Sequence, residues 1–191
     1  ESAGEGAIVD YEIIDTFSEL VTGGNESYVV NAESIHITDV SVVDLLNSEL
    51  EGWIAGTGVN APATFEISDT QSALLNIGVD VAVLSEATSV TVENAMTITE
   101  LEILFSSTGL AASSFENFKY TVLDDAETLL SELRTDPASE LAGLIRAAQT
   151  YEAVDATFEE AYASSEIADT KFSYSLDGEL TSANLPAEGI T

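Results

Sequence analysis

The sequence has no cysteine, a single histidine and only four basic residues among its 191 positions. Without cysteine the chain forms no disulfide framework and no thiolate metal site, and it offers no cysteine nucleophile. The basic residues Lys119, Arg134, Arg146 and Lys171 are scattered along the chain. Binding to nucleic acid or to an anionic lipid surface needs clustered basic side chains, so we expect neither partner.

Long apolar runs and nucleotide-binding motifs are missing as well. No stretch approaches the roughly 20 apolar residues of a transmembrane helix, so no membrane insertion is expected. No glycine-rich phosphate-binding motif occurs, so nucleotide cofactors have no support. The sequence begins with Glu1 instead of methionine, which favours a processed N-terminus.

Acidic residues are abundant. The chain has 35 Asp and Glu and a formal net charge of −31, yet 45% of its residues are hydrophobic, enough for a folded core. Such a charge is strongly self-repelling, but in molar salt the Debye length falls to about 3 Å and the repulsion is screened. The composition resembles that of proteins from halophilic archaea and their viruses. We therefore predict a hypersaline setting, with condensed or structural cations and no cofactor.

Alternating apolar residues favour a mainly β fold. They are densest in 72–105, where Val79, Val81 and Val83 fall on one side, and we predict two or three strands there. Further strands are predicted at 8–14, 34–43, 64–68, 118–122 and 172–176. In 34–43 the alternation slips at Thr38 and Asp39, which indicates a β-bulge. The expected fold class is a β-sandwich with jelly-roll-like antiparallel sheets.

Helical spacing replaces the alternation between residues 124 and 163. Asp124 and the Asp136-Pro137 pair resemble helix starts, and Val154 belongs to a third apolar stripe. We predict one domain over 1–191, with a loose segment at 1–7, a helical insert at 124–163 and a closing hairpin at Asp177-Gly178. No internal repeat of fixed period is evident.

Catalytic side chains are not arranged in any recognisable motif. His36 lies between Ile35 and Ile37, so its ring points away from their face, and a surface-strand histidine is expected rather than a dyad with Asp39 or Asp44. The acidic pairs Asp124-Asp125 and Glu159-Glu160, together with Asp155, are interpreted as helix starts and solvated faces. We expect the protein not to be an enzyme.

Three other features are candidate sites. Trp53 lies in a glycine-rich stretch, either as a sugar-stacking platform or as a cap on the end of the core. Asn25 begins a glycosylation sequon. The N-terminal strand could pair with a neighbouring subunit through Ile8, Val9, Tyr11 and Ile13.

These observations together predict a structural assembly subunit that forms homo-oligomers, shells or filaments, with other structural proteins as further partners. The leading form is a virion protein of a halophilic archaeal virus, either a single-jelly-roll capsid protein or a tail-tube type. The first alternative is a subunit of a secreted pilus or filament, or of a cell-surface fibre, whose copies are joined by strand complementation. The second alternative is a carbohydrate-binding β-sandwich. The expected location is an extracellular particle or the cell surface.

Overall fold

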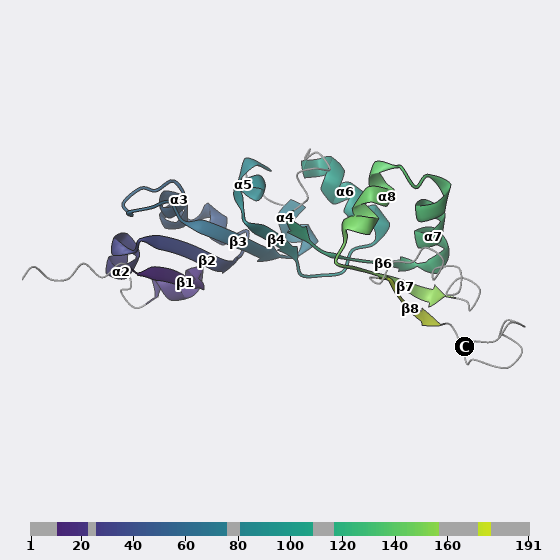
Figure 1. Ribbon diagram of the computed structural model, residues 1–191, viewed down its shortest axis with the longest axis horizontal. Coiled ribbons are helices and arrows are strands. Elements are labelled where there is room, and N and C mark those ends of the chain that lie inside the picture. The colour runs from purple at the N-terminus through teal and green to yellow at the C-terminus, as the bar shows by residue number, and fades with distance from the viewer. Residues whose placement is uncertain (1–10, 23–25, 76–80, 109–116, 157–171, 177–191) are drawn as a thin grey trace, which may run out of the picture. The chain divides into compact units, whose positions relative to one another are not determined.

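The computed structural model describes residues 11–22, 26–75, 81–108, 117–156 and 172–176 (Figure 1). The strands are β1 (Glu12–Thr16), β2 (Ser34–Val40), β3 (Thr64–Asp69), β4 (Ser89–Val92), β5 (Phe118–Lys119), β6 (Thr121–Asp125), β7 (Thr150–Ala156) and β8 (Phe172–Leu176). The helices are α1 (Phe17–Val21), α2 (Glu26–Asn31), the 3-10 helix η1 (Asp44–Leu46), α3 (Ser48–Ile54), α4 (Gln71–Leu75), α5 (Val81–Glu86), α6 (Ile98–Thr108), α7 (Ala126–Thr135) and α8 (Glu140–Ala147).

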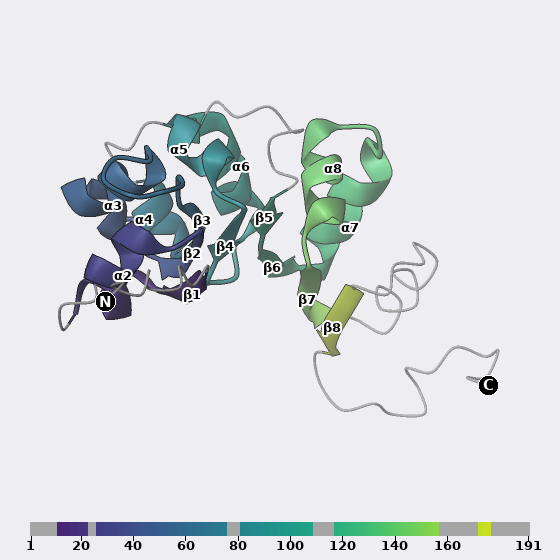
Figure 2. The same ribbon diagram turned by 60° about the vertical axis from the view of Figure 1, so that its left-hand side comes forward.

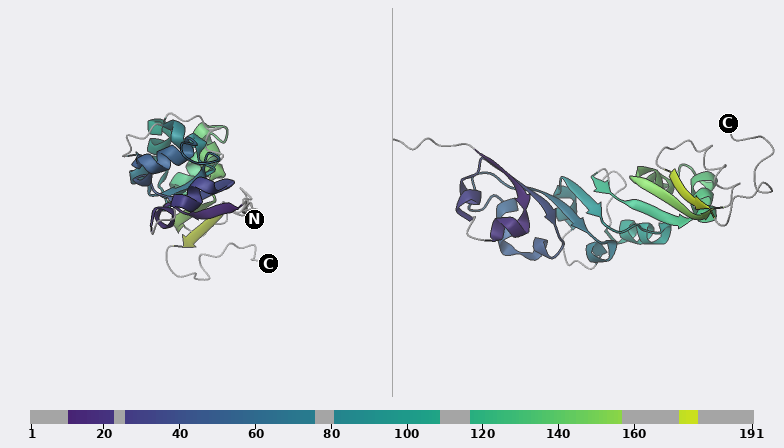
Figure 3. Two further views of the ribbon diagram at one scale, coloured as in Figure 1. Left: turned by 90° about the vertical axis from the view of Figure 1, so that its left-hand side faces the viewer. Right: turned by 90° about the horizontal axis from the view of Figure 1, so that it is seen from below.

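The strands pair in the order in which they occur in the chain. One sheet has the order β1-β2-β3-β4-β5 and the other has the order β6-β7-β8, and their pairings are parallel. The chain divides into two compact units, one of residues 1–69 and 77–90 and one of residues 70–76 and 91–191, and β4 contributes to both. In Figure 3 (right) the strands of the first unit lie side by side in sequence order.

The protein therefore has an α/β fold, and the predicted antiparallel β-sandwich is wrong. The alternation itself is present, because Ile35 and Ile37 are buried while Ser34 and His36 are only partly so. A sheet with one polar face is usually antiparallel. Here the strands are parallel, and helices such as α7 and α8 lie on one side of β6 and β7 (Figure 2), so the other face keeps its polar residues.

The segment 72–105 is mostly helical, contrary to the prediction of successive strands. Within its described part it forms α4, α5 and α6 and only one strand, β4. In α6 the residues Leu101 and Leu104 are fully buried, whereas Ile103 is 44% exposed. This is the three-residue spacing of a helix face. Short apolar runs fit a buried helix and a strand about equally well, so periodicity alone misassigned them.

The predicted helical insert also needs correction. α7 begins after Asp125, whose side chain accepts a hydrogen bond from the Thr128 amide, and α8 begins after Ser139, which caps the Ala142 amide. The residues that follow form strand β7, which contains Val154. Residues 157–163 lie outside the described residues, as do Asp177, Gly178 and the rest of the predicted hairpin.

The predicted β-bulge is confirmed. The pairing of β2 with β3 changes register between Ile37 and Val40, and Asp39 has a φ of 56°. The same device recurs in β7, where the register with β8 shifts between Ala153 and Ala156 around an Asp155 with a φ of 54°. Aspartate tolerates this left-handed conformation better than most residues.

Candidate functional site

One structural module occurs twice, once in each unit. The first module (residues 11–40) runs β1-α1-α2-β2, and the second module (residues 120–156) runs β6-α7-α8-β7. Each begins with a tyrosine whose hydroxyl donates a hydrogen bond to a carbonyl of the second helix. Tyr11 donates to the Tyr28 carbonyl and Tyr120 to the Leu144 carbonyl, each at 2.6 Å.

Backbone hydrogen bonds confirm that the modules correspond. The Glu33 amide donates to the Tyr11 carbonyl at 2.9 Å, and the Gln149 amide donates to the Tyr120 carbonyl at the same distance. Both amides immediately precede the second strand of their module. The first helix is capped in the same way by the last residue of the first strand, through Thr16 in one module and Asp125 in the other.

The sequence analysis missed this duplication because the two copies differ in length. α1 has 5 residues whereas α7 has 10, so no fixed period survives. The signal lies instead in pairs of residues at corresponding positions. These are Tyr11 and Tyr120, Asp15 and Asp124, Leu20 and Leu129, Ala32 and Ala148, and Asp39 and Asp155.

Corresponding positions differ sharply in exposure. Tyr120 is 1% exposed, whereas Tyr11 is only partly buried; Leu144 is 3% exposed, whereas Tyr28 is 63% exposed. In the second unit a chain segment at Met96 pairs in parallel with β6 at Val122. In the first unit the corresponding strand, β1, is the first in its sheet order.

The side of β1 that faces away from β2 is therefore the principal candidate site, and we call it the β1 edge surface. A hollow of about 270 Å³ is lined by Tyr11, Ile13, Asp15, Leu20, Tyr28 and Val29. Ile14, in the same strand, is 63% exposed. Tyr11 and Ile13 belong to the predicted inter-subunit strand, whereas Ile8 and Val9 lie outside the described residues. The surface combines an edge strand with exposed apolar side chains, which are features of binding by strand addition.

His36 points to the polar face of the sheet, as predicted, but neither of the acids considered for a dyad is its partner. Its Nδ1 lies 2.8 Å from the Thr64 hydroxyl, and its Nε2 lies 3.6 Å from Glu66 Oε1. The Thr64 hydroxyl also lies 3.3 Å from the Ile35 carbonyl. The ring is thus held between Thr64 and Glu66 on neighbouring strand β3.

Asp44, the other proposed partner, is used locally. Its Oδ2 accepts hydrogen bonds from the amide and the hydroxyl of Ser41, at 2.9 and 2.6 Å. Asp39 occupies the left-handed bulge position in β2. These roles are those of turn and bulge residues.

Trp53 lies in the core and not on an open loop. It belongs to α3, is 6% exposed and packs edge-to-face against Phe17 with ring centroids 5.8 Å apart. This placement is that of a core residue, the second of the two interpretations. Asn25 of the glycosylation sequon lies outside the described residues.

Polar residues at the end of one strand accept hydrogen bonds from backbone amides in the connection that follows the preceding strand. Asp69 Oδ2 accepts a hydrogen bond from the Val42 amide at 3.0 Å, and Asn94 Oδ1 accepts one from the Gln71 amide at 2.9 Å. Asp125, at the end of β6, accepts a hydrogen bond from an amide of the helix that follows it directly, that of Thr128. Hydrogen bonds from the side chain and amide of Thr128 lower the pKa of its carboxyl group below the ordinary value.

The described residues form no evident metal-binding site. Within the described ranges, no group of three or more histidines and acids is arranged to hold a metal ion. Asp124 and Asp125 act as caps, Asp155 forms the bulge of β7, and Glu159 and Glu160 are not described. Among the described helices, none is both long and apolar enough to span a membrane.

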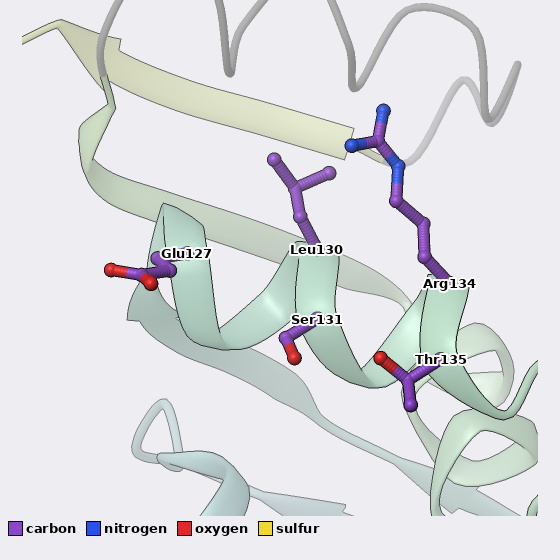
Figure 4. Close-up of a pocket in the computed structure, with 5 residues that line it drawn as sticks. All are labelled: Glu127, Leu130, Ser131, Arg134 and Thr135. Carbon is purple, nitrogen blue, oxygen red and sulfur yellow. The ribbon is translucent and has the colours of Figure 1, made fainter.

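Two other hollows among the described residues are weaker candidates for a binding site. One, of about 430 Å³, lies in the first unit and is lined by Leu45, Glu51, Ile54, Ala55, Val83 and Glu86. The other, of about 290 Å³, is lined by Glu127, Leu130, Ser131, Arg134 and Thr135, all of which come from α7 (Figure 4). The charged residues that line the first hollow are two carboxylates of like charge, Glu51 of α3 and Glu86 of α5, and the second hollow is lined by a single helix. Neither has the varied, convergent polar groups that usually mark a ligand site.

Comparison with known proteins assigns no family. No protein-family model matches the chain, and neither a curated protein nor a solved structure is significantly similar to it.

Proposed function

We propose that the chain is a structural subunit, built from repeated strand–helix modules, that self-assembles in concentrated salt. The observation that carries this proposal is the duplicated module, set in parallel sheets whose strands follow the order of the sequence. Repeat proteins of this kind are stabilised by contacts between neighbouring units, and the same contacts can be extended to further units. A scaffolding role needs no catalytic site.

The charge of the chain supports a saline setting for this role. With a net charge of −31, two copies repel each other strongly in dilute buffer. In molar salt the Debye length of about 3 Å confines that repulsion to near contacts, so short-range packing can dominate. Assembly should therefore strengthen as salt is added, opposite to the behaviour of complexes held by opposite charges.

A filament or fibre outside the cell, on the cell surface or in a virus particle, is the setting that we propose. Stacked parallel strands extend along one direction, which suits a fibre or tube better than a closed shell. The single-jelly-roll capsid form is not carried forward, because it required the antiparallel sandwich. The carbohydrate-binding form depended on an open Trp53 ring, and that residue packs in the core.

The test measures folding and mass together at two salt concentrations. In about 1 M KCl the full chain should be folded by circular dichroism and should form large homo-oligomers in sedimentation velocity. In about 0.1 M KCl it should dissociate and lose stability, because the charges are less screened. A folded chain that stays strictly monomeric at high salt and high protein concentration would contradict the assembly role. An unchanged stability across both salts would contradict the saline setting.

A further inference from the structure

We propose that the β1 edge surface binds strand β8 of a second copy of this chain, which joins the copies head to tail in a continuing parallel sheet. This inference rests on the proposed assembly role and names the contact that produces it. Its evidence is the difference between the two modules, since one has an occupied edge and the other presents the same groups with no occupant among the residues that the structure describes.

In the second module the edge of β6 is occupied by the segment around Met96. The Met96 amide donates to the Thr121 carbonyl at 2.9 Å, and the Leu123 amide donates to the Met96 carbonyl at 2.8 Å. Two residues further on, the Ile98 amide donates to Asp124 Oδ2 at 2.9 Å. An extended segment parallel to β6 is thus held by two main-chain bonds and one carboxylate.

The first module carries the same groups at corresponding positions. Glu12, Ile14 and Asp15 of β1 correspond to Thr121, Leu123 and Asp124 of β6. Asp15 Oδ1 accepts the amide of the following residue at 2.8 Å, and Asp124 Oδ1 does the same at 2.9 Å. The second oxygen of Asp124 takes the Ile98 amide. No described residue donates to the second oxygen of Asp15, and no described strand lies on that side of β1.

The apolar side chains show the same difference. Tyr28 and Ile14 are each 63% exposed, whereas Leu144 is 3% exposed and Leu123 is only partly exposed. In the second unit Met96, whose side chain is fully buried, lies beside β6. The hollow of about 270 Å³ beside Tyr11 and Tyr28 offers room for an apolar side chain of a partner strand. The missing occupant is therefore an extended, partly apolar strand that runs parallel to β1.

Strand β8 of another copy meets these requirements. It is the last strand of its sheet and runs parallel to β7, so that placing it before β1 continues the order found throughout the chain. Its sequence, FSYSL, alternates large apolar with small polar residues. A two-fold pairing of β1 with β1 would run antiparallel and would not reproduce the arrangement at β6. A head-to-tail contact is not completed within a pair of copies, so it continues from copy to copy, as an open filament unless the rotation between copies closes a ring.

The decisive variant is Ile14→Pro, which removes the amide that corresponds to the Leu123 donor. Proline is tolerated on an edge strand whose amide faces outward, so the chain should remain folded. We expect self-association in about 1 M KCl to weaken about tenfold or more, as measured by sedimentation velocity. Ile14→Val keeps the amide and should keep the association. Leu123→Pro is the matched control, because it breaks an internal bond and should increase amide exchange in the second unit.

A cross-linking experiment identifies the partner strand and covers the case in which Ile14→Pro unfolds. The natural chain has no cysteine, so two single variants, Ile14→Cys and Ser175→Cys, can be mixed and oxidised. We expect disulfide-linked heterodimers, and their yield should fall when Tyr28→Asp is added to the Ile14→Cys chain. Cross-linking only between two Ile14→Cys chains, or a closed dimer that does not grow with concentration, would overturn the proposed contact.

The outcomes separate this contact from the assembly role itself. Large oligomers that persist in both Ile14→Pro and Tyr28→Asp, without β1–β8 cross-links, would leave the assembly role standing and overturn the β1–β8 contact. A wild-type chain that remains monomeric in molar salt would overturn both. Concentration-dependent protection of the Ile14 amide in hydrogen exchange, together with the cross-link, would support both.

Discussion

Replacing Tyr120 with Phe tests whether the two modules are held by the same hydrogen bond in different surroundings. The hydroxyl of this residue, which is 1% exposed, donates to the Leu144 carbonyl at 2.6 Å. Burial raises the pKa of the Tyr120 phenol, so the group is a neutral donor under ordinary conditions. The corresponding hydroxyl of Tyr11 makes the same bond from a partly exposed position.

The loss of stability expected for Tyr120→Phe depends on whether the Leu144 carbonyl keeps another hydrogen-bond donor. The Leu144 carbonyl also accepts the Ala148 amide at 3.2 Å, so Tyr120→Phe does not leave it without a partner. We therefore expect the free energy of unfolding to fall by about 1 kcal/mol, the net worth of one hydrogen bond, and not by the roughly 3 kcal/mol of an orphaned buried carbonyl. For Tyr11→Phe, water can replace the hydroxyl, and the loss should be below about 0.5 kcal/mol.

The assay must report each unit separately and must keep the salt constant. Urea is the suitable denaturant, because guanidinium chloride would itself change the screening of the acidic surface. The single tryptophan, Trp53, belongs to the first unit and follows Tyr11→Phe by fluorescence. Amide exchange at Ala148 and Gln149 follows Tyr120→Phe in the second unit. Equal losses in the two variants, or no measurable loss in Tyr120→Phe, would refute the reasoning.

Two further predictions concern individual helices. Asp125→Ala should lower the free energy of unfolding by about 1 kcal/mol near neutral pH, because it removes the cap on the Thr128 amide. Since hydrogen bonding lowers the pKa of Asp125 in the folded state, the contribution of its carboxylate is present above the ordinary aspartate pKa of about 3.9 and is lost as the pH falls below it. Urea titrations of the variant and the wild type should therefore converge in acid, and a constant difference at all pH values would contradict this. In α6, Leu101→Ala should cost about 2–5 kcal/mol because that side chain is fully buried, whereas Ile103→Ala should cost less than about 1 kcal/mol because its side chain is 44% exposed. Similar losses in urea unfolding for these two variants would contradict the helical assignment.

Local features of the fold were predictable from the sequence. The strand predicted at 34–43 is found at Ser34–Val40, and its bulge at Asp39 and the polar orientation of His36 follow from alternation within a few residues. The start of α7 was placed within one residue, because an acidic cap followed by an apolar stripe is a local signal. The hydrogen bonds that decide these features join residues close together in the chain.

Non-local features were not predictable in the same way. Alternating apolar residues show that one face of a strand is buried, but they do not show which strand pairs with it or in which direction. The sheets are parallel because helices lie between successive strands, and this was obscured when 72–105 was assigned to strands. The β1 edge surface was missed in part, since Tyr11 and Ile13 were named as candidates but the adjoining Tyr28 was not.

By itself the sequence determined the charge, and hence the dependence on salt that we predict, together with the alternation and the helix caps, because each of these depends on composition or on near neighbours. Only the tertiary structure decided the parallel order of the strands and the correspondence between the modules. It also decided that Leu144 is buried while Tyr28, at the corresponding position, is exposed. The reason is physical: the exposure of a side chain depends on which segments lie around it, and such segments can come from outside the module, as the segment at Met96 beside β6 does.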